Sequence, residues 1–210
     1  MPTSVESPRR LRLSPQARIP LILDAALAEF SAQGYRAARI DDIATRAGLS
    51  KGGFYAHFAS KEALFIAVIE RTLVPPELDM AALLHQPQPS VRALVEQLVD
   101  MQYARFTDPA FLATARLLFS EGHRVPQVLA DWHDRTIGQL LERMADLLRQ
   151  CADRGWVRRS SVLDAPRLLI APAVHTLLHL VTFGPSPAVT VPEARAAHIK
   201  LLCELLELRG

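Results

Sequence analysis

The chain has 210 residues, of which half are hydrophobic and 22% are charged, and its formal net charge is only +2 at pH 7. This composition excludes a disordered tail and permits a buried core of one or two domains. The basic charge is concentrated near the amino end, where residues 1–61 hold nine Lys and Arg against five Asp and Glu. Such an imbalance is typical of a surface that meets nucleic acid.

The first segment, residues 1–14, contains prolines and arginines but no apolar run long enough for a secretory signal. We therefore expect a disordered basic arm and a cytoplasmic protein. A contact between this arm and the DNA backbone or minor groove is the alternative role. The sequence contains no run of about 18 apolar residues, so it predicts no membrane span.

Apolar side chains then recur at helical spacing and predict a helix that begins near Arg18 or Ile19 and runs to about Ala32. Pro20 is the reason for this start, because proline cannot sit deep in a helix. Gly34 is expected to close the helix.

Residues 39–58 then predict two short helices around a tight turn, which is a helix-turn-helix. Four apolar side chains share one face of the first helix: Ile40, Ile43, Ala44 and Ala47. Gly48 supplies the left-handed backbone that ends this helix, and Ser50 caps a second helix over residues 51–58.

Two adjacent glycines, Gly52 and Gly53, lie in the first turn of that second helix. Each costs roughly 0.5–1 kcal/mol relative to alanine, so stability alone does not explain them. Small residues suit a surface that brings its backbone close to another large molecule. Lys51, Tyr55 and His57 flank them and are able to reach phosphate oxygens. The pattern predicts a recognition helix for the DNA major groove.

Three segments carry a resemblance to a known family: ILDAALAEFSAQGY (22–35), DDIATRAGLSKGGFYAHF (41–58) and SKEALF (60–65). In this order and spacing, residues from about 19 to 67 resemble the DNA-binding domain of the TetR family of bacterial transcription regulators. One departure is Arg39, where the family has a capping Ser or Thr. A lost cap costs about 1 kcal/mol, which acidic residues in the first turn partly offset.

The resemblance implies an all-α fold of about nine helices. The predicted domains are a three-helix DNA-binding domain at residues 15–73 and a regulatory and dimerisation domain at residues 74–210, after a proline-rich break that holds at most a short turn at Met80–Leu84. Five further helices are predicted, over residues 91–106, 109–121, 126–154, 163–183 and 192–208.

The last two predicted helices carry more apolar surface than a solvated exterior allows. In the resembled family the corresponding pair forms a four-helix dimer interface. A two-fold dimer would read two half-sites of a pseudo-palindromic operator, whereas one helix-turn-helix reads too few base pairs. We therefore expect a homodimer bound to double-stranded DNA.

Residues expected at the DNA fall into two groups. Lys51, Tyr55, His57 and Lys61 would hold phosphates, Lys61 by its match to a phosphate-contacting position of the family. Arg39, Arg46 and the start of the second short helix would read bases. The full predicted set is Arg39, Arg46, Ser50, Lys51, Gly52, Gly53, Tyr55, His57 and Lys61.

The resemblance also implies a small-molecule effector enclosed by the carboxyl-terminal helices. Candidates for the lining are Tyr103, Phe106, Phe119, Trp132, Thr136, His175 and His179. For each of them ordinary core packing is the more frequent role. His175 and His179 lack a carboxylate or cysteine at ligand spacing, so no metal site and no cofactor is predicted. Cys151 and Cys203 are expected to be idle buried thiols.

These observations predict a DNA-binding transcription regulator. The family resemblance implies that it is a repressor and that a small-molecule ligand releases it from DNA. The alternative is a helical ligand-binding or interaction module without specific DNA binding, favoured by the uncapped Arg39 and the displaced start of the first helix. An enzyme is not predicted, because the sequence has no nucleophile elbow, zinc-protease motif, Walker loop or dinucleotide fingerprint.

Overall fold

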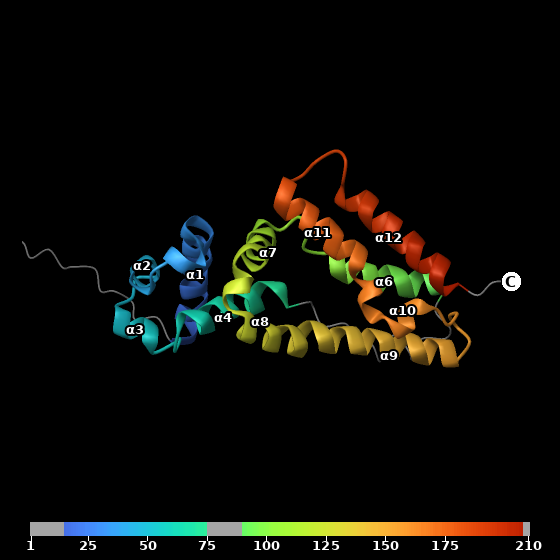
Figure 1. Ribbon diagram of the computed structural model, residues 1–210, viewed down its shortest axis with the longest axis horizontal. Helices are drawn as coiled ribbons and strands as arrows, with labels where there is room; N and C mark the ends of the chain where they lie inside the picture. Colours follow the sequence, from blue (N-terminus) through green and yellow to red (C-terminus); the bar gives the residue numbers. More distant parts are fainter. Residues whose placement is uncertain (1–14, 75–89, 208–210) are drawn as a thin grey trace, which may run out of the picture. The chain divides into compact units, whose positions relative to one another are not determined.

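A computed structural model describes residues 15–74 and 90–207. Within these ranges the regular secondary structure is helical, apart from one isolated bridge between Ser186 and Val189 (Figure 1). The predicted all-α fold is confirmed. None of the helices described combines the length and apolar character that a bilayer crossing requires.

The chain divides into two compact units, one ending at Val68 and the other beginning at Ile69. The domain boundary proposed from the sequence, after residue 73, lies close to this division and remains a prediction. The basic arm at residues 1–14 and the helical turn at Met80–Leu84 fall outside the described residues.

The first unit is built from helices of the amino-terminal segment. They are α1 (Pro15–Ala37), α2 (Ile40–Arg46), α3 (Lys51–Tyr55) and the greater part of α4 (Lys61–Leu73). The expected late start of α1 is wrong, because the helix begins at Pro15 and continues through Pro20. A proline at the first helical position lacks only an N–H that has no partner there, which favours this start. Gly34, with φ 76° and ψ 163°, breaks the helix as predicted.

Aromatic rings form the centre of the first unit. Phe30 and Phe65 are buried with ring centroids 5.8 Å apart, and Tyr35 lies 5.1 Å from Phe65. Phe54 fixes α3 to this core, since none of its surface is exposed. The apolar face of each short helix is therefore used inside the unit, and the opposite faces remain at the surface.

The second unit contains the remaining elements. They are α6 (Val91–Tyr103), α7 (Pro109–Glu121), η1 (Gly122–Arg124), α8 (Pro126–His133), η2 (Asp134–Gly138), α9 (Gln139–Asp153), α10 (Ser161–Asp164), η3 (Pro166–Leu169), α11 (Ala171–Phe183) and α12 (Val191–Leu206). Of the five helices predicted here, α7 has the bounds that its sequence indicated, with Pro109 at its start and Asp108 capping it through a bond from Ala110 N of 2.9 Å.

Two predicted helices are interrupted. The helix expected over residues 126–154 contains the π-helical turn η2, which separates α8 from α9. The helix expected over residues 163–183 is divided into α10, η3 and α11. Pro166 and Pro172 explain the second difference, because each starts a new helical segment at a position that needs no backbone N–H.

The helices of the second unit pack as layers around one core. α12 lies along α6, while α11 contacts both α7 and α12 (Figure 1). The core between them is aliphatic, with Leu94, Leu98, Met144, Leu148 and Leu202 fully or almost fully buried.

Candidate functional site

The turn between α2 and α3 has the local geometry of the predicted helix-turn-helix. Gly48 takes a φ of 71°, and the Ser50 hydroxyl accepts a hydrogen bond from Gly53 N of 3.1 Å. Arg39 supplies no side-chain cap to α2, as its sequence indicated. The second helix is shorter than predicted, since α3 ends at Tyr55, not at residue 58. The chain must turn there, because Ser60 caps α4 by accepting a bond from Ala63 N of 3.1 Å.

The outer face of α3 presents Lys51, Gly52 and Tyr55, all three exposed. The Tyr55 side chain is unusual for a large aromatic residue, with 48% of its surface exposed. A Cβ added at Gly52 would meet no atom of the chain within 4 Å. Neither packing nor backbone conformation within the chain therefore requires glycine at position 52.

Gly53 differs from its neighbour. A Cβ at Gly53 would lie 3.3 Å from the Ser50 hydroxyl oxygen, which is closer than ordinary van der Waals contact. Since that oxygen accepts the bond that caps α3, glycine at this position protects the cap. Of the two glycines assigned to close approach, only Gly52 lacks a reason inside the chain.

Charged residues of this surface are held by neighbours. Lys51 Nζ lies 3.0 Å from Asp41 Oδ1, and the Arg46 guanidinium lies 3.6 Å from the buried Glu29 carboxylate. Arg39 is exposed. Asp41 was not among the predicted site residues, because a partner ten residues away on another helix leaves no signal in helical periodicity.

Lys61 is placed differently from the other basic residues. Its ammonium donates to the carbonyls of Arg36 and Ala38 at 3.1 and 2.7 Å and lies 4.8 Å from the centroid of the Tyr35 ring. Burial lowers the pKa of this ammonium. The side chain closes the end of α1, and a phosphate contact by Lys61 remains a prediction.

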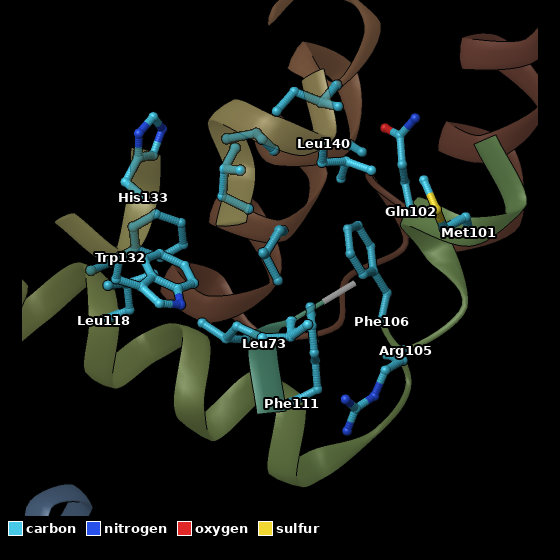
Figure 2. A pocket seen from close by; sticks show the side chains of 17 residues that line it. Leu73, Met101, Gln102, Arg105, Phe106, Phe111, Leu118, Trp132, His133 and Leu140 are labelled. Carbon is cyan, nitrogen blue, oxygen red and sulfur yellow. The ribbon is translucent and has the colours of Figure 1, made fainter. Parts of the chain in front are cut away.

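The second unit encloses a cavity of about 320 Å³, which falls at the lower end of the range of small-molecule sites. The lining is mainly apolar and consists of Leu73, Val74, Met101, Gln102, Arg105, Phe106, Phe111, Leu118, Phe119, Trp132, His133, Ile137, Leu140, Ile170, Ala173, Val174 and Leu177. Figure 2 shows Met101 and Gln102 of α6 at one end and Trp132 and His133 of α8 at the other.

Only some of the seven residues predicted to line a ligand pocket line this cavity. Phe106, Phe119 and Trp132 line it. Tyr103, Thr136, His175 and His179 are not among its lining residues.

Each of the four residues outside the lining has another environment. Tyr103 is buried, with its ring 5.0 Å from Phe106 and 5.9 Å from His198. Thr136 lies in η2, His175 is exposed, and His179 Nε2 lies 3.4 Å from the Ser186 hydroxyl.

Arg105 joins the cavity wall to the end of α4. Its Nη1 donates to Thr72 O at 2.6 Å, its Nη2 donates to Asp108 Oδ2 at 2.7 Å, and its guanidinium lies 5.4 Å from the Phe111 ring centroid. The Arg105 hydrogen bond is the main reason why the pKa of the Asp108 carboxyl lies below its usual value. Sequence reasoning missed Arg105, which lies in a turn after α6.

Residues 15–74 and 90–207 contain no group of three or more His, Cys, Asp or Glu side chains placed to hold a metal ion. Cys151 and Cys203 are buried free thiols, and burial raises the pKa of each.

Family models match both parts of the chain. Residues 22–68 match the model of bacterial regulatory proteins of the tetR family, and residues 90–201 match the carboxyl-terminal domain of AefR-like transcriptional repressors. Among curated proteins, the HTH-type transcriptional repressor SCO4008 of Streptomyces coelicolor is 35% identical over 108 residues, which is 51% of each chain. The chain thus matches about half of that relative's length.

Solved structures of the same fold align with this chain over most of its length. A TetR family transcriptional regulator from Pseudomonas syringae is 25% identical, with a TM-score of 0.71 over 94% of this chain and all of that one. SmeT, solved as a complex with triclosan, is 21% identical, with a TM-score of 0.72 over 93% of this chain and 94% of its own.

Proposed function

Because the chain belongs to the TetR family, we propose that it is a DNA-binding transcription regulator whose α2–turn–α3 segment enters the major groove of an operator. The observation that carries this proposal is the open face of α3, where Gly52 has no role inside the chain and lies beside exposed Lys51 and Tyr55. A missing side chain at a surface lets the backbone approach a partner closely. A lysine and a phenol beside it suit phosphate oxygens.

The active form would be a homodimer joined through α11 and α12. Large apolar side chains are exposed on these helices, with exposed fractions of 43% for Val174, 47% for Leu178, 74% for Phe183 and 43% for Leu201. Val174 and Leu178 lie one turn apart, so they form one stripe. Burying this stripe against a second copy would present two α3 helices to a pseudo-palindromic operator.

The cavity of the second unit would hold a small effector that releases the protein from DNA, which makes the regulator a repressor. The apolar lining and the volume of about 320 Å³ support this role. SmeT, a fold neighbour, was solved with triclosan bound, which is a precedent for a ligand in this fold. Leu73 of α4 lines the cavity, and α4 begins within the DNA-binding unit, so an effector there has a route by which to act.

A gel-shift titration with DNA from upstream of the protein's own gene tests this function. We expect a specific complex that Lys51→Ala and Tyr55→Ala each weaken, with a smaller dependence of log K on log salt for the lysine variant. Arg159→Ala serves as a control, since this arginine pairs with Asp153 in the second unit. If specific and unrelated DNA bind equally at every salt concentration, the regulator proposal fails.

A further inference from the structure

The chemistry of the cavity lining identifies the class of effector, an inference that rests on the proposed function. Gln102, Arg105 and His133 are the polar residues of its lining, and Trp132 adds one polar atom, its buried indole Nε1, which has no hydrogen-bond partner. No Asp or Glu is among these described lining residues, so no carboxylate in the wall would compensate the charge of a cationic ligand. A cationic effector would therefore bind at a large desolvation cost.

Arg105 is the one lining residue with a permanent positive charge, and two of its guanidinium nitrogens already donate to partners. One nitrogen donates to Thr72 O at 2.6 Å and another to the Asp108 carboxylate at 2.7 Å. A ligand carboxylate that took the place of Asp108 in this pair would lose one charge-assisted hydrogen bond to gain another. Because Asp108 already neutralises the Arg105 charge, the wall offers an anionic ligand little net attraction.

Gln102 provides an uncharged polar group with an unpaired acceptor. Its Nε2 donates to Leu98 O at 3.0 Å and to Leu169 O at 3.2 Å, which fixes the side chain, while its Oε1 is buried without a hydrogen-bond partner. A buried acceptor without a partner is costly and rare, so a donor that reaches it gains affinity. In Figure 2 the amide lies at the α6 end of the lining.

We propose that the cavity binds an uncharged, mainly apolar molecule that carries a hydrogen-bond donor, such as a hydroxyl, which meets Gln102 Oε1. The aromatic and aliphatic walls supply most of the affinity, and the contact with Gln102 sets the orientation of the ligand. Trp132, at the opposite end of the cavity, is almost fully buried and reports on occupancy.

Four probes with the same ten-carbon chain test the class: decan-1-ol, 1-methoxydecane, decanoate and decylammonium, each below its aggregation limit at pH 7.5. Binding is followed by tryptophan emission in a Trp156→Phe background, where Trp132 is the only tryptophan left, and by calorimetry with the unmodified protein. We expect decan-1-ol to bind about tenfold or more tighter than either charged probe. A charged probe that binds within tenfold of decan-1-ol overturns the proposal, and so does binding of no probe.

Larger side chains at one lining position test whether the probe binds in this cavity. Ala173 is buried in the lining, so the series Ala173→Val, Ala173→Leu and Ala173→Phe should reduce decan-1-ol affinity progressively as the cavity shrinks. Thermal melts identify the variants that remain folded, and the valine change is the mildest of the three. Affinity that stays constant across the folded members of the series places the ligand elsewhere and overturns the proposal.

The donor contact is checked with Gln102→Met and the matched ether. The unmodified protein should prefer decan-1-ol to 1-methoxydecane by about threefold to tenfold, and the variant should lose this preference. A purely structural role of Gln102 would weaken both probes equally and leave the preference intact, which would overturn the donor assignment.

Binding is measured without DNA, so its failure is distinguishable from failure of the proposed function. If decan-1-ol binds as expected but leaves the operator complex intact, the ligand class stands and the releasing role fails. If the protein binds its operator specifically but takes up none of the probes, the regulator proposal stands and the ligand class fails.

Discussion

Neighbouring residues of α3 that look equivalent in the sequence have different surroundings in the folded chain. The hydroxyl of Ser50 lies where a side chain at Gly53 would need space, whereas Gly52 faces open solvent. The sequence indicates two costly glycines, but only coordinates separate the one that protects a helix cap from the one that leaves a surface bare.

Gly52→Ala should therefore separate stability from DNA binding. Alanine is expected to raise the free energy of unfolding by roughly 0.5–1 kcal/mol, because it favours the helix and meets no atom of the chain. The added methyl should weaken operator binding about tenfold or more if the backbone approaches DNA at this point. Denaturant unfolding and gel shifts measure the two effects, and a variant that binds as tightly as the parent would remove the main support for the α3 interface.

Alanine substitution should destabilise the protein more at Lys61 than at Lys51. Lys61→Ala removes two bonds to backbone carbonyls and should cost about 1–3 kcal/mol of unfolding free energy. Lys51 is exposed and pairs with exposed Asp41, so Lys51→Ala should change stability by less than about 1 kcal/mol. Denaturant unfolding of both variants checks this contrast, and equal effects on stability would contradict it.

His198 should make the protein sensitive to acid. It is 1% exposed on α12, and burial lowers its pKa from 6.5 to about 4. Between these values the unfolded chain holds a proton at this site that the folded chain lacks, so stability falls as pH decreases through the window and changes no further below it. His198→Leu should reduce the slope of unfolding free energy against pH by up to about 1.4 kcal/mol per unit. Equal slopes from pH 6.5 to 4 would show that the ring is protonated in the folded protein.

At the scale of elements, local patterns predicted helices well where caps and prolines mark their ends. Pro109 begins α7 as expected, and Gly34 breaks α1. The π-helical turn η2 has no such marker, because apolar spacing continues through it from α8 into α9. Its widened turn is seen only in the folded chain.

Of the candidate sites, the sequence predicted the α3 surface well but the cavity lining only in part. The exposed face of α3 follows from helical spacing and the Ser50 cap, both of which are local. The cavity depends on which apolar side chains of distant helices leave space between them, and periodicity does not carry that information. Phe106 and Tyr103 lie three residues apart, and both were predicted to line a pocket because they are aromatic residues on an apolar helix. Only Phe106 lines the cavity. Arg105 was missed because its partner Thr72 O is a backbone atom of another helix.

One element, α12, depends on a long-range cap. Arg158 closes its carboxyl end: the backbone N–H donates to Leu206 O at 2.7 Å, and the guanidinium donates to Glu204 O and Leu205 O, each at 3.0 Å. Carbonyls at a helix end need such donors.

Arg158→Ala should therefore lower the free energy of unfolding by about 1–3 kcal/mol, because it leaves these carbonyls without the side-chain donors. The neighbouring Arg159→Ala should cost less than about 1 kcal/mol, since its pair with Asp153 is exposed. Thermal and denaturant melts of the two variants measure the difference. If Arg159→Ala alone lowered the free energy of unfolding, the assignment of Arg158 as the cap of α12 would be wrong.

At the scale of the whole molecule, the proposed function requires two copies of the chain. A single recognition helix reads only a few base pairs, so specific binding needs a second helix held at a fixed distance. The exposed apolar side chains of α11 and α12 are suited to this contact, because Leu178 and Leu201 are large, apolar and nearly half exposed in a single chain. Oligomeric state and DNA affinity should therefore change together.

Leu178→Glu places a charge among these apolar side chains and should produce a folded monomer, since an unpaired charge at an apolar interface costs several kcal/mol. Leu21→Glu is the matched control: Leu21 is 44% exposed, close to the 47% of Leu178, but belongs to α1. Analytical ultracentrifugation should give half the parent mass for Leu178→Glu alone, and operator affinity should fall with it by a factor of about 100 or more, because one half-site remains. A dimer that persists in Leu178→Glu would move the interface away from α11 and α12, whereas a monomer that retains full operator affinity would show that one copy reads the DNA.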